Sequence, residues 1–199
     1  GDSLAVLVKM LQPLDLNPDI VQLMGSVTCE SISSTPQAVV TSLAEMFHGH
    51  ADFLNLPLYI PNDYVRETLC NDANNSVILK KGIFCDKVIA SIGTMGKIRE
   101  SDYWRGSMPP EIYKDLVEKG ACGSILGRFF DANGQELACD WNEKSISLSI
   151  QQLRNISDVV IVASPVSKAP ALLAALKGDF INTLITDGTT ATRILNEAK

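Results

Sequence analysis

The sequence lacks the features of a membrane protein, a disulfide-rich protein and a zinc protein. No apolar run is long enough to span a bilayer, and the start of the chain has no basic-then-apolar signal pattern. The five cysteines are scattered and never spaced as Cys-x-x-Cys, which argues against a disulfide framework and a zinc site. We therefore expect a cytoplasmic location, where thiols stay reduced, and no membrane partner.

Sequence signatures of catalysis and nucleotide binding are missing as well. The chain contains no Gly-x-Ser-x-Gly elbow of hydrolases, no Gly-x-Gly-x-x-Gly loop opening a helix and no Walker-type phosphate loop. The two histidines, His48 and His50, have no cysteine or carboxylate cluster near them in the sequence, so a metal site is not expected. We predict no metal and no other cofactor.

Basic residues are too few for a nucleic-acid-binding surface. The chain carries 17 Lys and Arg against 23 Asp and Glu, a formal net charge of −6, and the basic residues form no cluster. Contacts to phosphate backbones need Lys and Arg. Any binding of DNA must therefore belong to a segment outside this chain.

What the chain does contain is a regular alternation of helix and strand patterns. The apolar content, 46% of 199 residues, is sufficient for one core. Helices are expected over residues 2–12, 34–49, 62–72, 74–82, 109–120, 147–156, 169–178 and 189–199. Strands are expected over residues 19–24, 51–60, 86–93, 158–164 and 181–187, with a hairpin over 127–139.

This order predicts an α/β fold, a doubly wound and mostly parallel sheet with right-handed crossovers. A small antiparallel excursion is expected near residues 127–145. No linker, repeat or low-complexity run divides the chain, so we expect one domain over residues 1–199. The chain begins at Gly1 and enters a helical pattern almost at once, which favours a fragment that lacks its first strand.

Ligands of such sheets bind outside the carboxyl ends of the strands. Backbone N–H groups and helix dipoles at those ends can hold an anion. Each segment also has a purely structural explanation: an ordinary turn at Gly93, a solvated side chain for Lys168, and an N-cap cluster at Asp187. The segments that follow predicted strands are residues 24–28, 93–96, 164–168 and 187–190, and residues 1–3 would follow the missing strand.

Several strings resemble the SorC family of transcription regulators, in order and over nearly the whole chain. The most specific is GACGSILGRFFDANG within residues 118–137. The others are VQLMGS (21–26), VIASIGTMG (88–96) and the stretch from VIVASPVSK to ITDGTTATRIL (160–195). The resemblance implies a Rossmann-like effector domain that binds a phosphorylated sugar and is related to sugar-phosphate isomerases and deaminases. It also implies an upstream helix-turn-helix DNA-binding segment and assembly into a dimer or tetramer.

The resemblance also implies a set of ligand-binding residues. Phosphate contacts fall in the loop around Gly1, Asp2 and Ser3, and an arginine ahead of the Gly-Ala-x-Gly run would be Arg105. The other ligand-binding residues implied are Gly25, Ser26, Gly93, Thr94, Ser124 and Lys168.

The sequence departs from the family pattern at three places. Gly25–Ser26 stands where the family usually has two glycines, which alters the loop. Ser124 stands where the family usually has Asp or Glu, and this removes a charge-assisted hydrogen bond of about 1.5–3 kcal/mol when buried. Residues 163–165, Ala-Ser-Pro, replace Ala-Gly-Gly before Lys168, which could narrow the pocket.

Three functions are compatible with these patterns. The leading hypothesis is a sensor of a phosphorylated sugar without catalytic activity. An isomerase or deaminase of the same fold is the alternative, but it needs a carboxylate base, ideally with a histidine, and the strand ends offer Asp187 and little else. A ligand-free oligomerisation module is the third, because Ser124 replaces the usual acidic residue.

Overall fold

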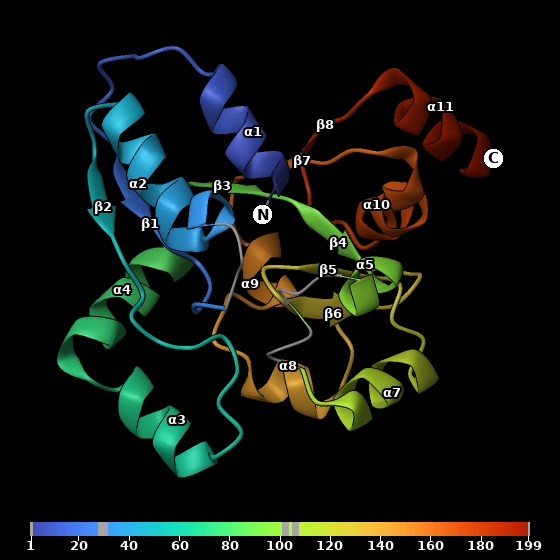
Figure 1. The fold of residues 1–199 in the computed structure, drawn as a ribbon, viewed down its shortest axis with the longest axis horizontal. Coiled ribbons are helices and arrows are strands. Elements are labelled where there is room, and N and C mark those ends of the chain that lie inside the picture. Colours follow the sequence, from blue (N-terminus) through green and yellow to red (C-terminus); the bar gives the residue numbers. More distant parts are fainter. Residues whose placement is uncertain (1, 28–31, 101–103, 105–107, 199) are drawn as a thin grey trace.

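The computed structural model describes residues 2–27, 32–100, 104 and 108–198, and Figure 1 shows how their helices surround short strands. The helices are α1 (Asp2–Met10), α2 (Pro36–Met46), α3 (Asp63–Cys70), α4 (Ala73–Ile83), α5 (Met95–Glu100), α7 (Pro110–Glu118), α8 (Asp140–Lys144), α9 (Ile150–Arg154), α10 (Ala169–Lys177) and α11 (Gly188–Glu197), with 3₁₀ turns η1 (Ile32–Ser34) and η2 (Val166–Lys168). The strands are β1 (Asp19–Val21), β2 (His50–Asp52), β3 (Lys87–Ala90), β4 (Ile92–Thr94), β5 (Gly123–Ile125), β6 (Arg128–Phe130), β7 (Asp158–Val162) and β8 (Thr183–Ile185).

The strands form parallel sheets plus one antiparallel sheet. Strands β3, β7 and β8 pair in parallel in that order, and β1 pairs in parallel with β2. Strands β4, β5 and β6 form the antiparallel sheet. The predicted α/β class is therefore confirmed, and the antiparallel part begins earlier than expected, at Ile92.

The main core lies around β7. Val159 and Ile161 of β7 are fully buried, as expected for a parallel strand that is covered on both faces. Strand β3 contributes Val88, and α10 packs its small and apolar face onto the same cluster, with Leu172 at its centre. No helix among the described residues has the length and apolar character needed to cross a bilayer.

Helix boundaries follow the capping residues. Thr35 caps α2 by accepting a hydrogen bond from the N–H of Ala38, and Pro36 occupies the first turn. Ser149 and Gln152 form a capping box at the start of α9, so this helix begins three residues later than the pattern predicted. The helices predicted over 62–72, 74–82, 109–120, 169–178 and 189–199 are all present, within a few residues at each end.

The strand predicted over 86–93 is two strands in different sheets. The ladder with β7 ends at Ala90, and after Ser91 the chain enters β4 of the antiparallel sheet. Gly93 and Thr94 are strand residues, not a loop as predicted, and Met95 begins α5. The period-two pattern continues across Ser91, so the sequence does not reveal this change of sheet.

The strand predicted over 51–60 is wrong beyond Asp52. The segment stays extended, since Leu54, Leu56, Leu58 and Ile60 are buried at alternate positions. It forms only isolated bridges, however, because its neighbours at Ser26 and Ser145 belong to irregular segments. Proline at position 57 also lacks the N–H that a continuous ladder requires.

The hairpin predicted over residues 127–139 is instead formed by β5 and β6, so it begins one strand earlier in the sequence. Strands β5 and β6 are joined by Leu126 and Gly127, which both have positive φ (49° and 80°), as a tight two-residue hairpin turn requires. The predicted turn, residues 131–134, instead follows β6 and leads to a single antiparallel bridge between Phe130 and Glu136. Strand β5 was not predicted because its three residues are too few to show a period.

Gly134 and Gly178 allow two backbone segments to touch. A Cβ at Gly134 would lie 2.3 Å from the carbonyl oxygen of Ala174 and 2.6 Å from the Cα of Gly178. Gly134 also has a φ of +71°, which disfavours other residues. Arg154 donates two hydrogen bonds to the carbonyl of Gly178 and so fixes the end of α10 against this loop.

We predict that Gly134→Ala destabilises the protein more than Gly120→Ala does. Gly120 has a similar φ of +77°, but no atom lies within 4 Å of its would-be Cβ. Gly120→Ala should therefore lower the free energy of unfolding only by the left-handed conformational cost, about 1–2 kcal/mol. Gly134→Ala adds the backbone clash. Urea unfolding of both variants tests this, and equal losses would show that the backbone contact costs nothing to disrupt.

Candidate functional site

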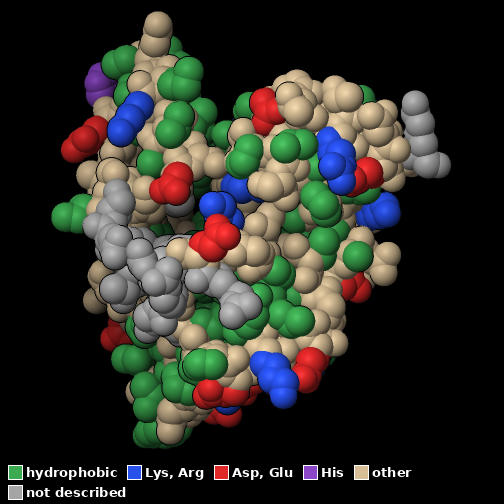
Figure 2. Space-filling model, turned by 45° about the vertical axis from the view of Figure 1, so that its right-hand side comes forward, with side chains coloured by type: hydrophobic (Ala, Val, Ile, Leu, Met, Phe, Trp, Pro, Cys, Tyr) green, Lys and Arg blue, Asp and Glu red, His purple; other side chains and the backbone are tan. Residues whose placement is uncertain are grey.

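The carboxyl ends of both parallel sheets meet at the start of α1. The hydroxyl of Ser34, the last residue of the turn η1 ahead of α2, donates to the carboxylate of Asp2 at 2.7 Å. The charge of Asp2 also acts on Lys168, which follows β7. Figure 2 shows acidic and basic side chains meeting near the middle of one face of the molecule. The segments around Asp2 and Lys168, two of those singled out in the sequence, therefore lie in one region.

Lys168 is the cation of this region. It ends η2 and stands directly before the first turn of α10, as predicted. Its Nζ lies 3.4 Å from the hydroxyl of Ser91, the residue at which the chain changes sheets. Burial lowers the pKa of the Lys168 ammonium, and the charge of Asp2 partly opposes this. Among the described residues, no carboxylate lies within ion-pair distance of Lys168.

Gly93 and Ser124 lie opposite each other in the antiparallel sheet. Ser124 is 6% exposed, and a Cβ at Gly93 would lie 2.6 Å from its hydroxyl oxygen. Glycine at position 93 is thus needed for the Ser124 side chain to take its place. Thr94 pairs with Gly123 in the same ladder, and β4 contacts η2, which brings this pair of strands close to Lys168.

Gly25 and Ser26 are held by backbone pairing. The N–H of Gly25 donates to the carbonyl of Ile146, and the N–H of Ser26 donates to that of Leu56. These N–H groups are therefore not free to hold an anion, contrary to the interpretation of this loop as a phosphate cradle. Of the polar groups discussed in this loop, the hydroxyl of Ser26 remains for a ligand. This hydroxyl accepts a hydrogen bond from the side-chain amide of Gln37.

Two of the predicted contacts cannot be placed. Arg105 and Gly1 lie outside the described residues. Ser3 lies in the first turn of α1, beside Asp2, and is partly buried. First-turn N–H groups of a helix have no partner within the helix, so this turn can donate to an anion.

Asp187 caps a helix and is not placed to act as a base. Its carboxylate accepts hydrogen bonds from the N–H and hydroxyl of Thr190, at 2.8 and 2.7 Å, and from the hydroxyl of Ser164 at 2.9 Å. These bonds lower the pKa of Asp187 to about 2. A carboxylate with so low a pKa is a weak proton acceptor at neutral pH. The N-cap interpretation of this segment is confirmed.

Two features of the region were missed in the sequence. Ser91 was included in the strand predicted over residues 86–93. A hydroxyl side chain in an otherwise apolar run could have indicated that this residue differs from its neighbours. An aromatic cluster also covers the face of β6 opposite α10: Tyr59 stacks on Trp141 with ring centroids 4.6 Å apart, and Trp104 contacts Phe129 and Trp141. These aromatics come from segments up to 82 residues apart (59 to 141), so no local pattern reveals them.

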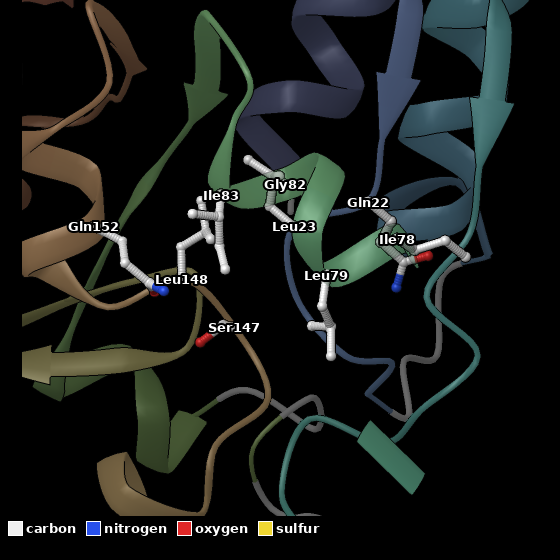
Figure 3. A pocket seen from close by; sticks show the side chains of 9 residues that line it. All are labelled: Gln22, Leu23, Ile78, Leu79, Gly82, Ile83, Ser147, Leu148 and Gln152. Carbon is white, nitrogen blue, oxygen red and sulfur yellow. The ribbon is translucent and has the colours of Figure 1, made fainter. Parts of the chain in front are cut away.

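A separate cavity lies away from these residues. It has a volume of about 60 Å³ and lies between α4, the residues after β1 and the segment that leads into α9. Figure 3 shows its mostly apolar lining, with Leu79 of α4 on one side and Leu148 on the other. None of the predicted ligand-binding residues lines it, so it is not the candidate site.

Comparison with known proteins gives consistent matches. Residues 1–196 match the family described as "Putative sugar-binding domain". The Deoxyribonucleoside regulator of Bacillus subtilis (strain 168) is 27% identical over 198 residues, which cover 99% of this chain and 63% of that protein. The Sorbitol operon regulator of Klebsiella pneumoniae is 28% identical over 145 residues, which cover 73% of this chain and 45% of that protein.

A solved structure supports the fold. The full-length Sorbitol Operon Regulator SorC from Klebsiella pneumoniae has a TM-score of 0.89 at 23% identity, over 98% of this chain and 64% of that chain. The chain thus spans less than two thirds of the length of these relatives.

The fold and the family match define a sugar-binding α/β domain, and the relatives it matches are regulators by name. The chain belongs to the sugar-binding domain family, and its resemblance to SorC-type regulators is confirmed.

We predict that Asp187 contributes stability that is lost in acid. Its folded pKa of about 2 lies below the ordinary value of 3.8, so the carboxylate stabilises the folded state above about pH 4, and this contribution falls as the pH drops toward 2. The stability difference between wild type and Asp187→Asn should therefore shrink between about pH 4 and about pH 2. Urea unfolding at each pH measures it. A difference that stays constant would contradict the capping role of the charged form.

Proposed function

We propose that this domain senses a phosphorylated sugar, whose phosphate binds at Lys168 and the first turn of α1. The sugar then extends toward Gly93, Thr94 and Ser124. Ser26 and Arg105 remain part of the proposed site as further contacts to the ligand.

The burial of Lys168 carries this proposal. A cation that loses water without gaining a carboxylate partner is unfavourable, and a cation before a helix N-terminus also opposes the helix dipole. A bound dianion removes both costs, because it pairs with the ammonium and accepts from free N–H groups. Asp2 is the acidic residue whose charge acts on Lys168, and its carboxylate accepts a hydrogen bond from the hydroxyl of Ser34.

The position of Ser124 bears on the identity of the sugar. A buried hydroxyl can both donate and accept, whereas the carboxylate usual in the family only accepts. A Cβ at Gly93 would lie 2.6 Å from that hydroxyl oxygen, so glycine at position 93 keeps the space that the Ser124 side chain occupies. We therefore expect the ligand to differ from that of relatives with an acidic residue at this position.

The whole protein's role is also a proposal, because the chain covers only part of its relatives. The matches to regulators support a longer cytoplasmic protein that binds operator DNA through a separate segment. The net charge of −6 is consistent with DNA binding outside this domain. Assembly into a dimer or tetramer is proposed from the family resemblance.

We predict that Lys168→Ala weakens binding of the phosphorylated sugar by about 2–3 kcal/mol, the scale of a lost charge-assisted hydrogen bond. A panel of phosphorylated and unphosphorylated sugars is first screened by thermal shift. Calorimetric titration of the best phosphosugar against wild type and variant then gives the affinities. The matching sugar without phosphate should bind both proteins weakly and equally.

Lys177→Ala is the matched control, since Lys177 is an exposed lysine at the other end of the same helix. It should leave the phosphosugar affinity unchanged. Equal affinity in wild type and Lys168→Ala would remove Lys168 from the site, and no phosphosugar binding at all would leave the ligand-free oligomerisation module.

We also predict that the purified domain self-associates. Sedimentation at tens of micromolar, roughly the range of weak interfaces, should show a dimer or tetramer. A purely monomeric species at that concentration would count against an assembly formed by this domain.

A further inference from the structure

A buried side-chain amide holds strand β6 on the edge away from β5. Asn142 of α8 is 2% exposed. Its Oδ1 accepts a hydrogen bond from the N–H of Phe129 at 2.8 Å, and its Nδ2 donates to the carbonyls of Phe129 and Leu137 at 2.8 and 2.9 Å. Paired residues of antiparallel strands exchange one N–H···O bond in each direction. The carboxamide of Asn142 therefore does for Phe129 what a residue of a neighbouring strand would do.

Helix α8 is attached to the hairpin of β5 and β6 at two further points. The indole N–H of the fully buried Trp141 donates to the carbonyl of Gly127, in the hairpin turn, at 2.8 Å. In the opposite direction, Nη1 of Arg128 donates to the carbonyl of Asn142 at 2.7 Å. Figure 1 shows α8 below β6, with which it is in contact. The turn and the strand that leaves it are thus both fixed to α8.

Phe129 lies directly beside Ser124 in the antiparallel sheet. Ser124 pairs with Phe129 of β6 on one side and with Gly93 of β4 on the other. Gly93 leaves space for the Ser124 hydroxyl but has no side chain that could hold it. The ladder joins Ser124 to Phe129, and Asn142 holds the backbone of Phe129. A displacement of β6 is therefore passed to Ser124 through one strand pair.

We propose that Asn142 is a positioning residue for the ligand site, which holds Phe129 and thereby sets where the Ser124 hydroxyl meets the sugar. This inference rests on the proposed function, in which the sugar extends toward Ser124. It adds a residue that touches no ligand and that lies on a helix other than those that approach the phosphate.

The chemistry of the amide is the reason for this assignment. An apolar side chain at position 142 could also pack α8 against β6, but it would leave the buried N–H of Phe129 without this partner. A carboxamide offers one acceptor oxygen and one NH2 group, and Asn142 uses both. A buried polar network whose members are all paired makes one arrangement rigid and unique. Asn142 thus fixes one position of β6 where apolar packing alone would permit several.

Rigid placement matters because a hydrogen bond weakens steeply when its distance or angle departs from the preferred geometry. Ser124 is 6% exposed, so its short side chain has little freedom to follow a ligand when the strand beneath it moves. If β6 shifts, the bond between the Ser124 hydroxyl and the sugar is lost and not rearranged. The affinity for the sugar should therefore depend on Asn142.

The first measurement needs no ligand. Hydrogen exchange of individual amides is compared in wild type and Asn142→Ala at Ser124 and, as a reference for global unfolding, at Ile161 of β7. Exchange at Ser124 should speed up by about tenfold more than exchange at Ile161, on the scale of a lost hydrogen bond. A change at Ser124 no larger than that at Ile161 would overturn the proposal. If Asn142→Ala does not fold, Asn142→Asp keeps the size and the acceptor, loses both donated bonds as a carboxylate, and gives the same comparison.

Asn182→Ala is the matched control. The side chain of Asn182 also accepts a hydrogen bond from a strand N–H, that of Val159 in β7, at 2.7 Å. Its removal should speed exchange at Val159 and leave exchange at Ser124 as in wild type. A response of Ser124 as large as that to Asn142→Ala would show that the effect is not specific to the contact with β6.

The second measurement separates a positioning role from a merely structural one. Calorimetry gives the affinity for the phosphosugar with the largest thermal shift in the panel above. Asn142→Ala should weaken this affinity by about tenfold in the wild-type background. In a Ser124→Ala background it should weaken it by about twofold or less, because the hydroxyl that Asn142 positions is then absent. Inorganic phosphate, which has no sugar to reach Ser124, should bind wild type and Asn142→Ala equally.

An equal loss of phosphosugar affinity in both backgrounds would overturn the proposal, since Asn142 would then act on the fold alone. If wild type binds no phosphosugar of the panel, the proposed function is contradicted, and the exchange measurement still decides whether Asn142 fixes the position of Ser124.

Discussion

Strand β7 is the element on which the rest of the molecule depends. It pairs on both edges, with β3 and β8, and it buries Val159 and Ile161 completely. A strand enclosed in this way can carry no charge along its length, so polar groups are confined to its ends. The helices that cover it, α10 among them, must present small and apolar residues. Everything of functional interest then gathers where β7 stops, at Ser164, Lys168 and the caps of the following helices.

This confinement explains the electrostatics of the candidate site. Asp187 and Lys168 both follow parallel strands, yet they differ in their surroundings. Asp187 is surrounded by donors from Thr190 and Ser164, which stabilise its charged form and lower its pKa to about 2. In the described part of the chain, the Lys168 ammonium has the hydroxyl of Ser91 at 3.4 Å as its hydrogen-bond partner, and burial lowers its pKa while the charge of Asp2 partly opposes this. The charged form of Asp187 is thus stabilised within the chain, whereas that of Lys168 is not, and this contrast is what supports the proposed phosphate contact at Lys168.

The sequence predicts local structure well where the signals are local. Helix α7 lies between Pro109 and Gly120, and α11 begins at an Asp-Gly-Thr-Thr cap, so both could be placed from a few residues. Strand β5 and the change of sheet at Ser91 could not, because three-residue strands and a one-residue break leave no period to read. The site was found only in outline. Lys168 is placed by chain order, but its neighbour Ser91 lies 77 residues away, and contacts at that separation are decided by packing.

The contact between Gly134 and Gly178 also bears on how this sequence can change over evolutionary time. With a Cβ at either position meeting the other's backbone, neither glycine can drift to another residue unless the partner segment moves as well. Such a pair is expected to remain fixed across descendants although it touches no ligand. Invariance at these two positions would therefore reflect the close backbone contact between a loop and a helix end. It should not be taken as evidence of where the sugar binds.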